Sequence, residues 1–160
     1  MASGNAERTT PNKKTPAGHL LILACSQRKI DAKSPMPAFH LYDGVNYRVL
    51  RKALLERGWP PDLQIRILSA KYGFIDAATR ILPYDKRMNK ARAEEINKDA
   101  LAELKKIPSP ASVLINLGQD YLPAVKNIER VFARSRVVYA QGRIGERLHQ
   151  MKDWLQSLKR

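Results

Sequence analysis

Four short apolar runs, each followed by polar residues or glycine, constrain the fold of this 160-residue chain more than any other feature. The runs are residues 19–24, 63–69, 112–117 and 136–140. The segments between them carry apolar residues at helical spacing, and proline or glycine separates the two kinds of segment. This alternation, βαβαβαβα, is typical of a parallel sheet covered by helices on both faces. We therefore predict a three-layer α/β/α domain with a central four-stranded, mainly parallel sheet.

Amphipathic segments near residues 45–58, 89–107, 123–130 and 144–158 predict the helices. Asn89 is a suitable N-cap for the second of them. The predicted core-facing residues are Val45, Val49, Leu50, Leu54, Ala93, Ile96, Ala100, Leu101, Leu104, Ile144, Leu148, Met151, Trp154, Leu155 and Leu158.

The charge of the chain is strongly basic, with 29 Lys and Arg against 15 Asp and Glu and a formal net charge of +14. Only two of these net charges lie in residues 1–18, so about +12 belongs to the folded part. Such an excess repels itself in a compact fold unless a polyanion is bound regularly. Nucleic acid is therefore the leading partner class, with DNA favoured over RNA, and a basic but solvated surface is the alternative.

Residues 1–18 lack an apolar core and are rich in Ser, Thr, Pro, Asn and Lys. We predict a disordered basic tail there and a single α/β domain over residues 19–160.

No apolar run approaches the ~18 residues of a membrane span, so no membrane partner is expected. The single cysteine, Cys25, excludes an internal disulfide and permits a reducing compartment. We expect a monomer in the cytoplasm, where it could associate with the nucleoid.

The candidate site residues follow the four predicted strands. Because parallel strands place their carboxyl ends at one edge of a sheet, residues 25–29, 69–73, 118–121 and 141–145 should converge there. The three histidines have neither ligand spacing nor neighbouring ligands, so no metal site and no cofactor are predicted.

The cluster after the first strand offers a thiol, a hydroxyl and cations. Cys25 beside Arg28 and Lys29 could form a thiolate of lowered pKa and act as a nucleophile. A buried structural cysteine is the favoured alternative, because no histidine lies nearby in sequence to act as its base. Ser26 could bind a phosphate or a base edge, and Lys29 a phosphate.

The cluster Ser69-Ala70-Lys71-Tyr72-Gly73 has the composition of a nucleotide site. Its small residues allow close approach, Lys71 supplies charge, Tyr72 a ring for stacking, and Gly73 a turn with positive φ. The alternative is a strand-to-loop corner in which Tyr72 covers the core.

Two aspartates are candidate catalytic carboxylates. Asp85 lies in a predicted loop, residues 74–88, among Arg80, Lys86 and Arg87, which favour its ionised form. An ionised carboxylate suits glycosidic cleavage, because it can stabilise an oxocarbenium-like sugar and orient or deprotonate the attacking water. The alternative is a turn aspartate after Pro-Tyr. Asp120 is the second candidate, and it could equally be a helix cap.

Two further clusters are open to both interpretations. Gly142-Arg143-Ile144-Gly145 could offer backbone amides to an anion, or could simply begin a helix. Gly118-Gln119-Asp120-Tyr121 resembles the water-activating Gly-Gln-Asp-Pro-Tyr motif of uracil-DNA glycosylases. It lacks the proline and follows the third strand instead of the first, and these departures favour a coincidental match.

A set of segments resembles, in order, a domain-of-unknown-function family of small bacterial and phage proteins with C-S-x-x-K, L-Y, S-A-K-Y-G and Y-D motifs. The segments are residues 25–29, 41–44, 67–73, 83–85 and 144–148, and the resemblance covers residues 19–155. More distantly, residues 25–29 are similar to a segment of archaeosine synthases, and Ser69-Ala70-Lys71 to an element of DNA-binding peroxide-stress proteins. The resemblance implies nucleobase or nucleic-acid chemistry on a fold similar to uracil-DNA glycosylase.

These observations lead to one main hypothesis, a nucleic-acid base N-glycosidase that hydrolyses the glycosidic bond of a modified or damaged base. A flipped base would stack on Tyr72 or Tyr42, and Lys29, Lys71 and Arg143 would hold phosphates. The predicted catalytic residues are Asp85, Lys71 and Ser26, and the predicted binding residues are Cys25, Lys29, Tyr42, Ser69, Tyr72, Gly73, Gln119, Asp120, Arg143 and Gly145. A non-catalytic DNA- or RNA-binding module and an N-glycosidase of free nucleosides or nucleotides are the alternatives.

Overall fold

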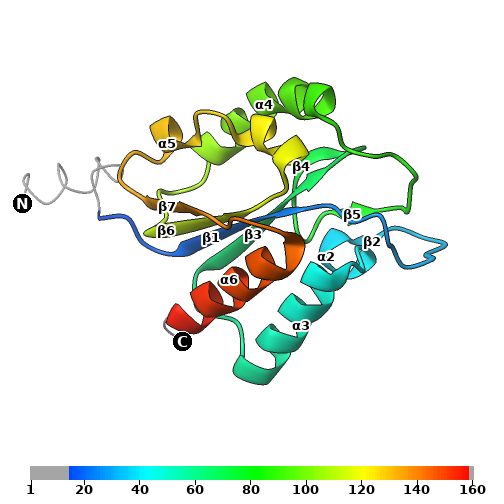
Figure 1. Ribbon diagram of the computed structural model, residues 1–160, viewed down its shortest axis with the longest axis horizontal. Coiled ribbons are helices and arrows are strands. Elements are labelled where there is room, and N and C mark those ends of the chain that lie inside the picture. Colours follow the sequence, from blue (N-terminus) through cyan, green and yellow to red (C-terminus); the bar gives the residue numbers. More distant parts are fainter. Residues whose placement is uncertain (1–14, 159–160) are drawn as a thin grey trace, which may run out of the picture.

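Helices cover both faces of a five-stranded sheet in the computed structural model, which describes residues 15–158 (Figure 1). The strands of this sheet, in spatial order, are β4 (Gly73–Asp76), β3 (Leu63–Ser69), β1 (His19–Ala24), β6 (Ser112–Asn116) and β7 (Arg136–Tyr139). Strand β1 pairs in parallel with β3 and β6, and β6 pairs in parallel with β7. Strand β4 is antiparallel to β3. The mixed α/β architecture with a mainly parallel sheet is confirmed, and the prediction of four strands was wrong by one.

The fifth strand arises at Gly73, where the chain reverses with φ at +82°. Residues with a side chain rarely adopt this conformation, and glycine does so without steric cost. After the reversal Phe74 pairs with Leu68 and Ile75 with Ile67, which extends the sheet at its edge.

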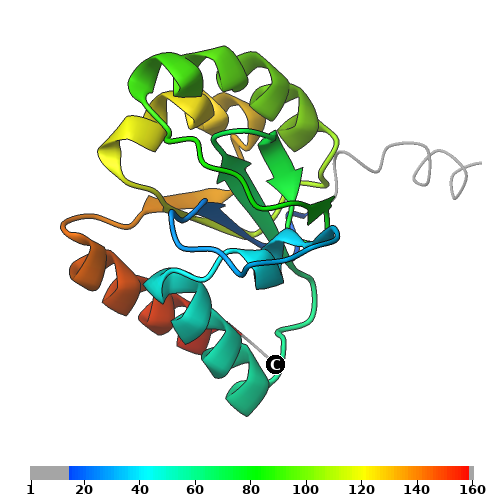
Figure 2. The same ribbon diagram turned by 90° about the vertical axis from the view of Figure 1, so that its right-hand side faces the viewer.

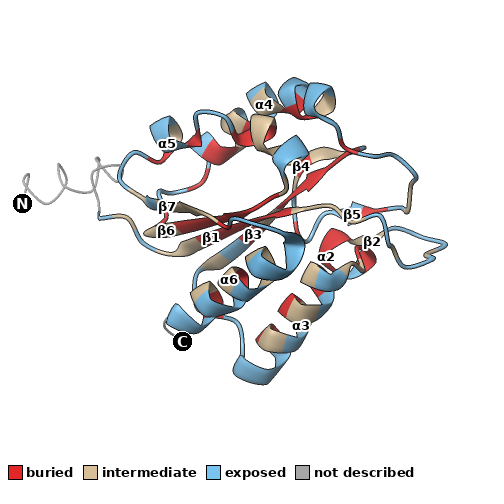
Figure 3. Ribbon diagram, viewed as in Figure 1, coloured by how far each residue is buried: buried red, intermediate tan, exposed pale blue. Residues whose placement is uncertain are grey.

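Two apolar layers enclose the sheet (Figure 2). One face is covered by α4 (Lys90–Lys105), the 3-10 helix η2 (Gln119–Val125) and α5 (Ile128–Val131). The other face is covered by α2 (Ala38–Leu41), α3 (Val45–Arg57) and α6 (Ile144–Ser157). The central strands are buried on both sides (Figure 3). Alternate residues of β1 therefore belong to different layers, Leu20 and Ile22 to the first and Leu21 and Leu23 to the second.

The long helices begin and end close to their predicted bounds, with differences in the buried face. Asn89 caps α4, since its Oδ1 accepts a hydrogen bond of 2.8 Å from the Arg92 amide. The buried residues are Tyr47, Leu50 and Leu54 in α3, Ala93, Ile96, Ala100 and Leu104 in α4, and Met151 and Leu155 in α6. Val45 and Ile144, predicted to face the core, are 45% and 52% exposed. Both begin their helices at the open edge of the sheet, where no layer covers them.

The predicted loop 74–88 contains regular structure instead. Besides β4 it includes β5 (Arg80–Ile81), which pairs antiparallel with β2 (Met36–Pro37). The backbone amides of Ala38 and Phe39 also donate hydrogen bonds to this segment, at 2.8 and 2.9 Å. The chain that leads to Asp85 is thus fixed to the segment that leads to α3.

The short helix predicted for residues 123–130 is divided into η2 and α5. Asn127 separates the two with φ at +74°, a conformation that interrupts a helix.

Most of the predicted tail, residues 1–14, lies outside the described residues. Ala17 and Gly18 form backbone hydrogen bonds with Ser109 and Ala111. Within residues 15–158 no helix is both long and apolar enough to cross a membrane.

Candidate functional site

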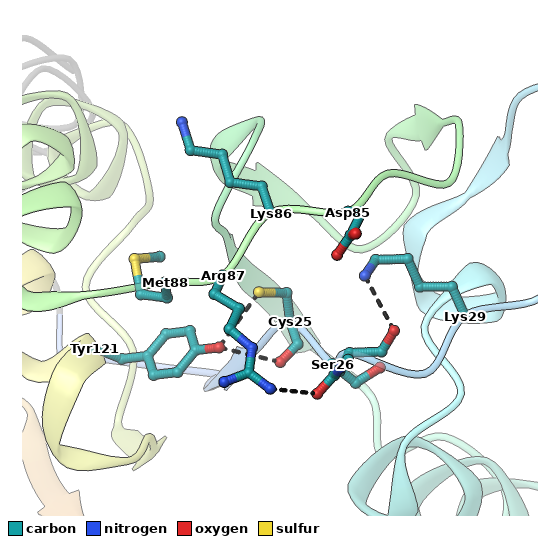
Figure 4. A pocket seen from close by; sticks show the side chains of 9 residues that line it. Cys25, Ser26, Lys29, Asp85, Lys86, Arg87, Met88 and Tyr121 are labelled. Carbon is teal, nitrogen blue, oxygen red and sulfur yellow. Dashed lines mark hydrogen bonds between the residues drawn. The ribbon is translucent and has the colours of Figure 1, made fainter.

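A cavity of about 290 Å³ lies at the carboxyl end of β1. Its walls come from the segment after β1, the segment before α4, and η2 (Figure 4). The lining residues are Cys25, Ser26, Gln27, Lys29, Asp85, Lys86, Arg87, Met88 and Tyr121. The structure therefore brings Cys25, Ser26, Lys29 and Asp85, which were all predicted as site residues, into one cavity.

The side chains of Lys29 and Asp85 point toward each other on one side of this cavity (Figure 4). The half-buried Lys29 donates a hydrogen bond of 3.2 Å to the Gln27 carbonyl, and its Nζ lies 4.3 Å from the centre of the Tyr84 ring. Burial lowers the pKa of Lys29, and the charges of Cys25 and Asp85 oppose this shift. Among residues 15–158 no hydrogen bond or salt bridge occupies the Asp85 carboxylate. Its oxygens are thus available to a ligand or a water molecule.

A triangle of hydroxyl groups lies behind Lys29. The Tyr42 hydroxyl is 3.0 Å from Ser69 Oγ and 2.7 Å from the Tyr84 hydroxyl, and Ser69 Oγ is 3.0 Å from the Tyr84 hydroxyl. Ser69 Oγ also accepts a hydrogen bond of 3.0 Å from the Tyr72 amide. Burial raises the pKa of Tyr84 to about 12 and that of Tyr42 further, so both phenols stay neutral.

Tyr42 and Ser69, which were both predicted to bind the ligand, belong to this buried network instead. Tyr42 and Ser69 are fully buried, so neither can contact a base or phosphate in this structure. The stacking role predicted for Tyr42 is excluded here by burial, because its ring packs in the core beside Tyr47 and Tyr84. Both residues support the wall from which Lys29 projects.

Lys71, Tyr72 and Gly73 do not line the cavity of Asp85. Lys71 is exposed, and its Nζ lies 5.3 Å from the centre of the Tyr72 ring. The Tyr72 ring packs edge-on against Tyr84, with 5.6 Å between ring centres. Arg92 holds this corner by hydrogen bonds of 2.7 and 3.1 Å to the carbonyls of Ala70 and Lys71. The segment 69–73 therefore shapes the wall behind the site, as in the corner interpretation, and Lys71 is not positioned to act with Asp85.

Cys25 and Ser26 form the floor between this cavity and a neighbouring one. Cys25 Sγ is half-buried, 3.4 Å from the Tyr121 hydroxyl. Ser26 Oγ donates a hydrogen bond of 2.6 Å to the Arg28 carbonyl and accepts one of 3.2 Å from the Gly44 amide. A Cβ at Gly44 would lie 2.8 Å from the Ser26 Cβ, so glycine is needed for this close approach. Ser26 thus positions the segment after β1 against the start of α3.

The remaining predicted residues lie around other cavities or on the surface. Gln119 lines a cavity of about 510 Å³ beside α6. Asp120 is exposed in the first turn of η2. The Arg143 amide donates a hydrogen bond of 2.9 Å to Glu146 Oε1, as expected if this segment simply begins helix α6. Gly145 is exposed in the first turn of α6. These four residues do not line the cavity of Asp85.

Tyr121, Gln27, Met88, Lys86 and Arg87 line the cavity without having been predicted as site residues. Tyr121 could have been found, because it belongs to the cluster after the third strand that was already placed at this edge. No sequence pattern identifies Met88 as a site residue. It lines the cavity because strands β4 and β5 fix the segment that precedes it.

A family model described as a family of unknown function (DUF6884) matches residues 20–153. The chain belongs to this family. The fold of the present chain is similar to the crystal structure of AF0587, a protein of unknown function, with a TM-score of 0.54 and 16% sequence identity. The similarity covers 96% of the present chain and 50% of AF0587, so the chain spans about half the length of that protein. A search of curated proteins finds no match.

Membership of the DUF6884 family confirms the predicted resemblance to a family of unknown function, and it does not bear on the resemblances to uracil-DNA glycosylases, archaeosine synthases or peroxide-stress proteins. The likeness to AF0587 shows a shared α/β fold alone, and neither finding assigns a reaction or relates the fold to uracil-DNA glycosylase.

Proposed function

We propose that the protein hydrolyses the N-glycosidic bond of a modified or damaged base in nucleic acid, with DNA as the first substrate to test. One observation carries this proposal: the Asp85 carboxylate, which has no hydrogen bond or salt bridge within residues 15–158, and the half-buried ammonium group of Lys29 lie beside each other in the lining of one cavity at the carboxyl edge of the sheet.

The two charges match the charges that develop when a glycosidic bond breaks. The sugar becomes an oxocarbenium-like cation, and the base leaves with negative charge. The Asp85 carboxylate would stabilise the sugar cation and orient or deprotonate the attacking water. The Lys29 ammonium group would stabilise the departing base. The reaction needs Asp85 ionised and Lys29 protonated, so that each opposes the charge that forms beside it.

The size of the cavity favours a single base. Its volume of about 290 Å³ is just below the ~300–1,000 Å³ that small-molecule sites occupy. A base inside a duplex could not enter, so it would have to be flipped out of the stack. Tyr121 and Met88 line the cavity and would contact the base, in place of the buried Tyr42.

The charge of the chain supports a nucleic-acid substrate. Lys86 and Arg87 are exposed on the lining of the cavity, on a chain whose net charge is +14. Cations around a small cavity would hold the phosphates on either side of a flipped nucleotide. The resemblance of residues 25–29 to archaeosine synthases, and a fold related to uracil-DNA glycosylase, would fit the same chemistry.

A screen for base release tests the proposal. The wild-type protein is incubated with duplex and single-stranded oligonucleotides that carry deaminated, alkylated, oxidised or otherwise modified bases. We expect abasic sites, detected by cleavage in alkali, on at least one substrate, and none with Asp85→Asn. Asp120→Asn is the matched control and should retain activity, because Asp120 does not line the cavity. A broad panel without any base release would refute the proposal.

A nucleic-acid-binding module without chemistry is the second candidate. It is favoured by the exposure of Asp85 and by the absence, within residues 15–158, of a hydrogen bond that orients its carboxylate. This alternative predicts tight, salt-sensitive binding that Asp85→Asn leaves unchanged, with no abasic product. A stronger affinity for a mononucleotide than for a 20-mer would instead favour the third candidate, a free nucleoside or nucleotide as the substrate.

A further inference from the structure

A second cavity, of about 350 Å³, lies beside the cavity of Asp85 and opens between the carboxyl ends of β1 and β6. The chain leaves β1 for β3 on one side and returns to β6 on the other, so these two strands flank the topological switch point of the sheet. Open α/β sheets bind ligands in the crevice at such a point. The cavity is lined by segments after β1 and β6 and by the first turns of α3 and α6.

Arg147 projects from α6 into the lining of this cavity. Its Nη1 donates a hydrogen bond of 3.1 Å to Asn116 Oδ1, and its Nε one of 3.2 Å to the Gly142 carbonyl. Both acceptors are neutral. A guanidinium group has five N–H donors, so most of its donor capacity is left over. Nη2 forms no hydrogen bond among residues 15–158, and it lies 3.8 Å from where a Cβ at Gly118 would be.

Arg28, Arg48 and Arg51, which lie near this edge, share one counter-charge, whereas Arg147 has none among residues 15–158. Asp43 lies 3.6 Å from Arg28, 3.0 Å from Arg48 and 2.6 Å from Arg51. No carboxylate in the described part of the chain lies within ion-pairing distance of the half-buried Arg147, and burial lowers its pKa. Removing a cation from water costs free energy, and no opposite charge offsets this cost at Arg147. An anionic ligand would supply the missing charge.

The arginine is held rigidly in this position. Asn116, its acceptor, is fully buried at the end of β6. The Asn116 amide nitrogen is 3.4 Å from Asn46 Oδ1 and 3.5 Å from Met151 Sδ, so strand β6 and helices α3 and α6 together orient it. A guanidinium group with a fixed orientation and unused donors is well suited to a phosphate, whose oxygens can accept two parallel hydrogen bonds.

The two cavities are adjacent, because both are lined by Cys25, Ser26, Gln27 and Tyr121. We propose that Arg147 binds the phosphate of the nucleotide whose base occupies the cavity of Asp85. The identity of the neighbouring group as a base rests on the proposed function, whereas phosphate binding by Arg147 does not require any catalysis. The phosphate could belong to a free nucleoside 5′-monophosphate or to a nucleic-acid strand.

The first arm of the test uses inorganic phosphate, which needs no base and no reaction. We expect phosphate to raise the Tm of the wild-type protein more than chloride at the same ionic strength does. This difference should disappear in Arg147→Gln, remain in part in Arg147→Lys, and remain in full in Arg130→Gln, an exposed arginine of α5. An equal response of wild type and Arg147→Gln to phosphate would refute the site, whatever the screen for base release shows.

The second arm compares a nucleoside, its 5′-monophosphate and a short single strand by calorimetric titration, on the Asp85→Asn background so that no substrate is consumed. Removal of the Arg147 guanidinium should weaken the phosphorylated ligands about tenfold or more and the nucleoside less than about twofold. Loss of affinity for the monophosphate alone would identify a free nucleotide as the source, and loss for the strand alone a phosphodiester. Equal weakening of nucleoside and phosphorylated ligands would refute the proposal.

Discussion

Ser69 is the residue on which the wall behind the cavity depends. Its hydroxyl meets the hydroxyls of Tyr42 and Tyr84 and the amide of Tyr72, and it is fully buried. Ser69→Ala would leave these partners with fewer hydrogen bonds inside the protein, at a cost of about 1–3 kcal/mol in the free energy of unfolding. Urea unfolding of Ser69→Ala beside the exposed control Ser34→Ala measures this difference. Equal stability of the two variants would show that the network contributes nothing.

Lys29 determines how base release should depend on pH. Its pKa is lowered by burial, and the proposed reaction needs its protonated form. At pH values where Asp85 is ionised, activity should therefore persist below this lowered pKa of Lys29 and fall as the pH rises through it. In Lys29→Arg the alkaline fall should move to higher pH, because the guanidinium pKa is above about 12. A pH profile with an alkaline limb at the same place in both proteins would exclude Lys29 as the group that titrates.

A position after a predicted strand identified some of the residues that line the cavity, but Lys71, Gln119, Asp120 and Arg143 also follow strands and do not line it. Cys25, Ser26 and Lys29 were predicted because a polar cluster after an apolar run lies at the sheet edge. Tyr42 and Ser69 were assigned to the ligand because sequence does not show that three hydroxyls satisfy one another inside the core.

At the scale of elements, Gly73 decides whether β4 can join the sheet. A Cβ added there would meet no atom within 4 Å, so the cost of Gly73→Ala is backbone strain alone, about 1–2 kcal/mol at its φ of +82°. Gly145→Ala is the matched control, since Gly145 also has free space around it and lies in α6. That variant should be more stable than wild type by up to about 1 kcal/mol. Chemical unfolding should show opposite signs for the two, and a shared sign would contradict this account.

The four parallel strands and the three long helices could be predicted, because each has several apolar residues at its own spacing. The elements β2, β4, β5 and α2 have two to four residues each, too few for any periodicity to appear. Strand β4 forms by antiparallel pairing with β3 after the turn at Gly73. The elements β2, β5 and α2 are held together because residues 36–39 and 77–81, far apart in sequence, form backbone hydrogen bonds with each other. The loop predicted to carry Asp85, residues 74–88, therefore contains two strands, and Asp85 lines the cavity from the segment that follows them.

At the scale of the whole molecule, the net charge of +14 should control binding to nucleic acid. Each phosphate contact contributes about −0.9 to the slope of log K against log salt on duplex DNA. Lys86→Gln with Arg87→Gln should therefore make the slope less steep by about 2. Lys98→Gln with Lys105→Gln removes the same charge from exposed positions of α4 and should change the slope less. Equal changes would mean that the cavity is not where nucleic acid binds.

The molecule as a whole was predictable in class and family but not in ligand. The βα alternation indicated a mainly parallel sheet, and the ordered motifs indicated the family that the chain belongs to. The division of the sheet edge into separate cavities was not predictable. It depends on side chains such as Tyr121, which lines both the cavity of Asp85 and the neighbouring one.

The most direct test of the central claim is the single-turnover rate of base release by wild type, Asp85→Asn and Asp120→Asn on one substrate from the screen. The cavity assigned to Asp85 predicts that Asp85→Asn lowers this rate by about 10²–10⁴-fold, the usual contribution of a positioned acid or base. Asp120→Asn should retain the wild-type rate. Full activity of Asp85→Asn, or loss of activity only in Asp120→Asn, would contradict the assignment.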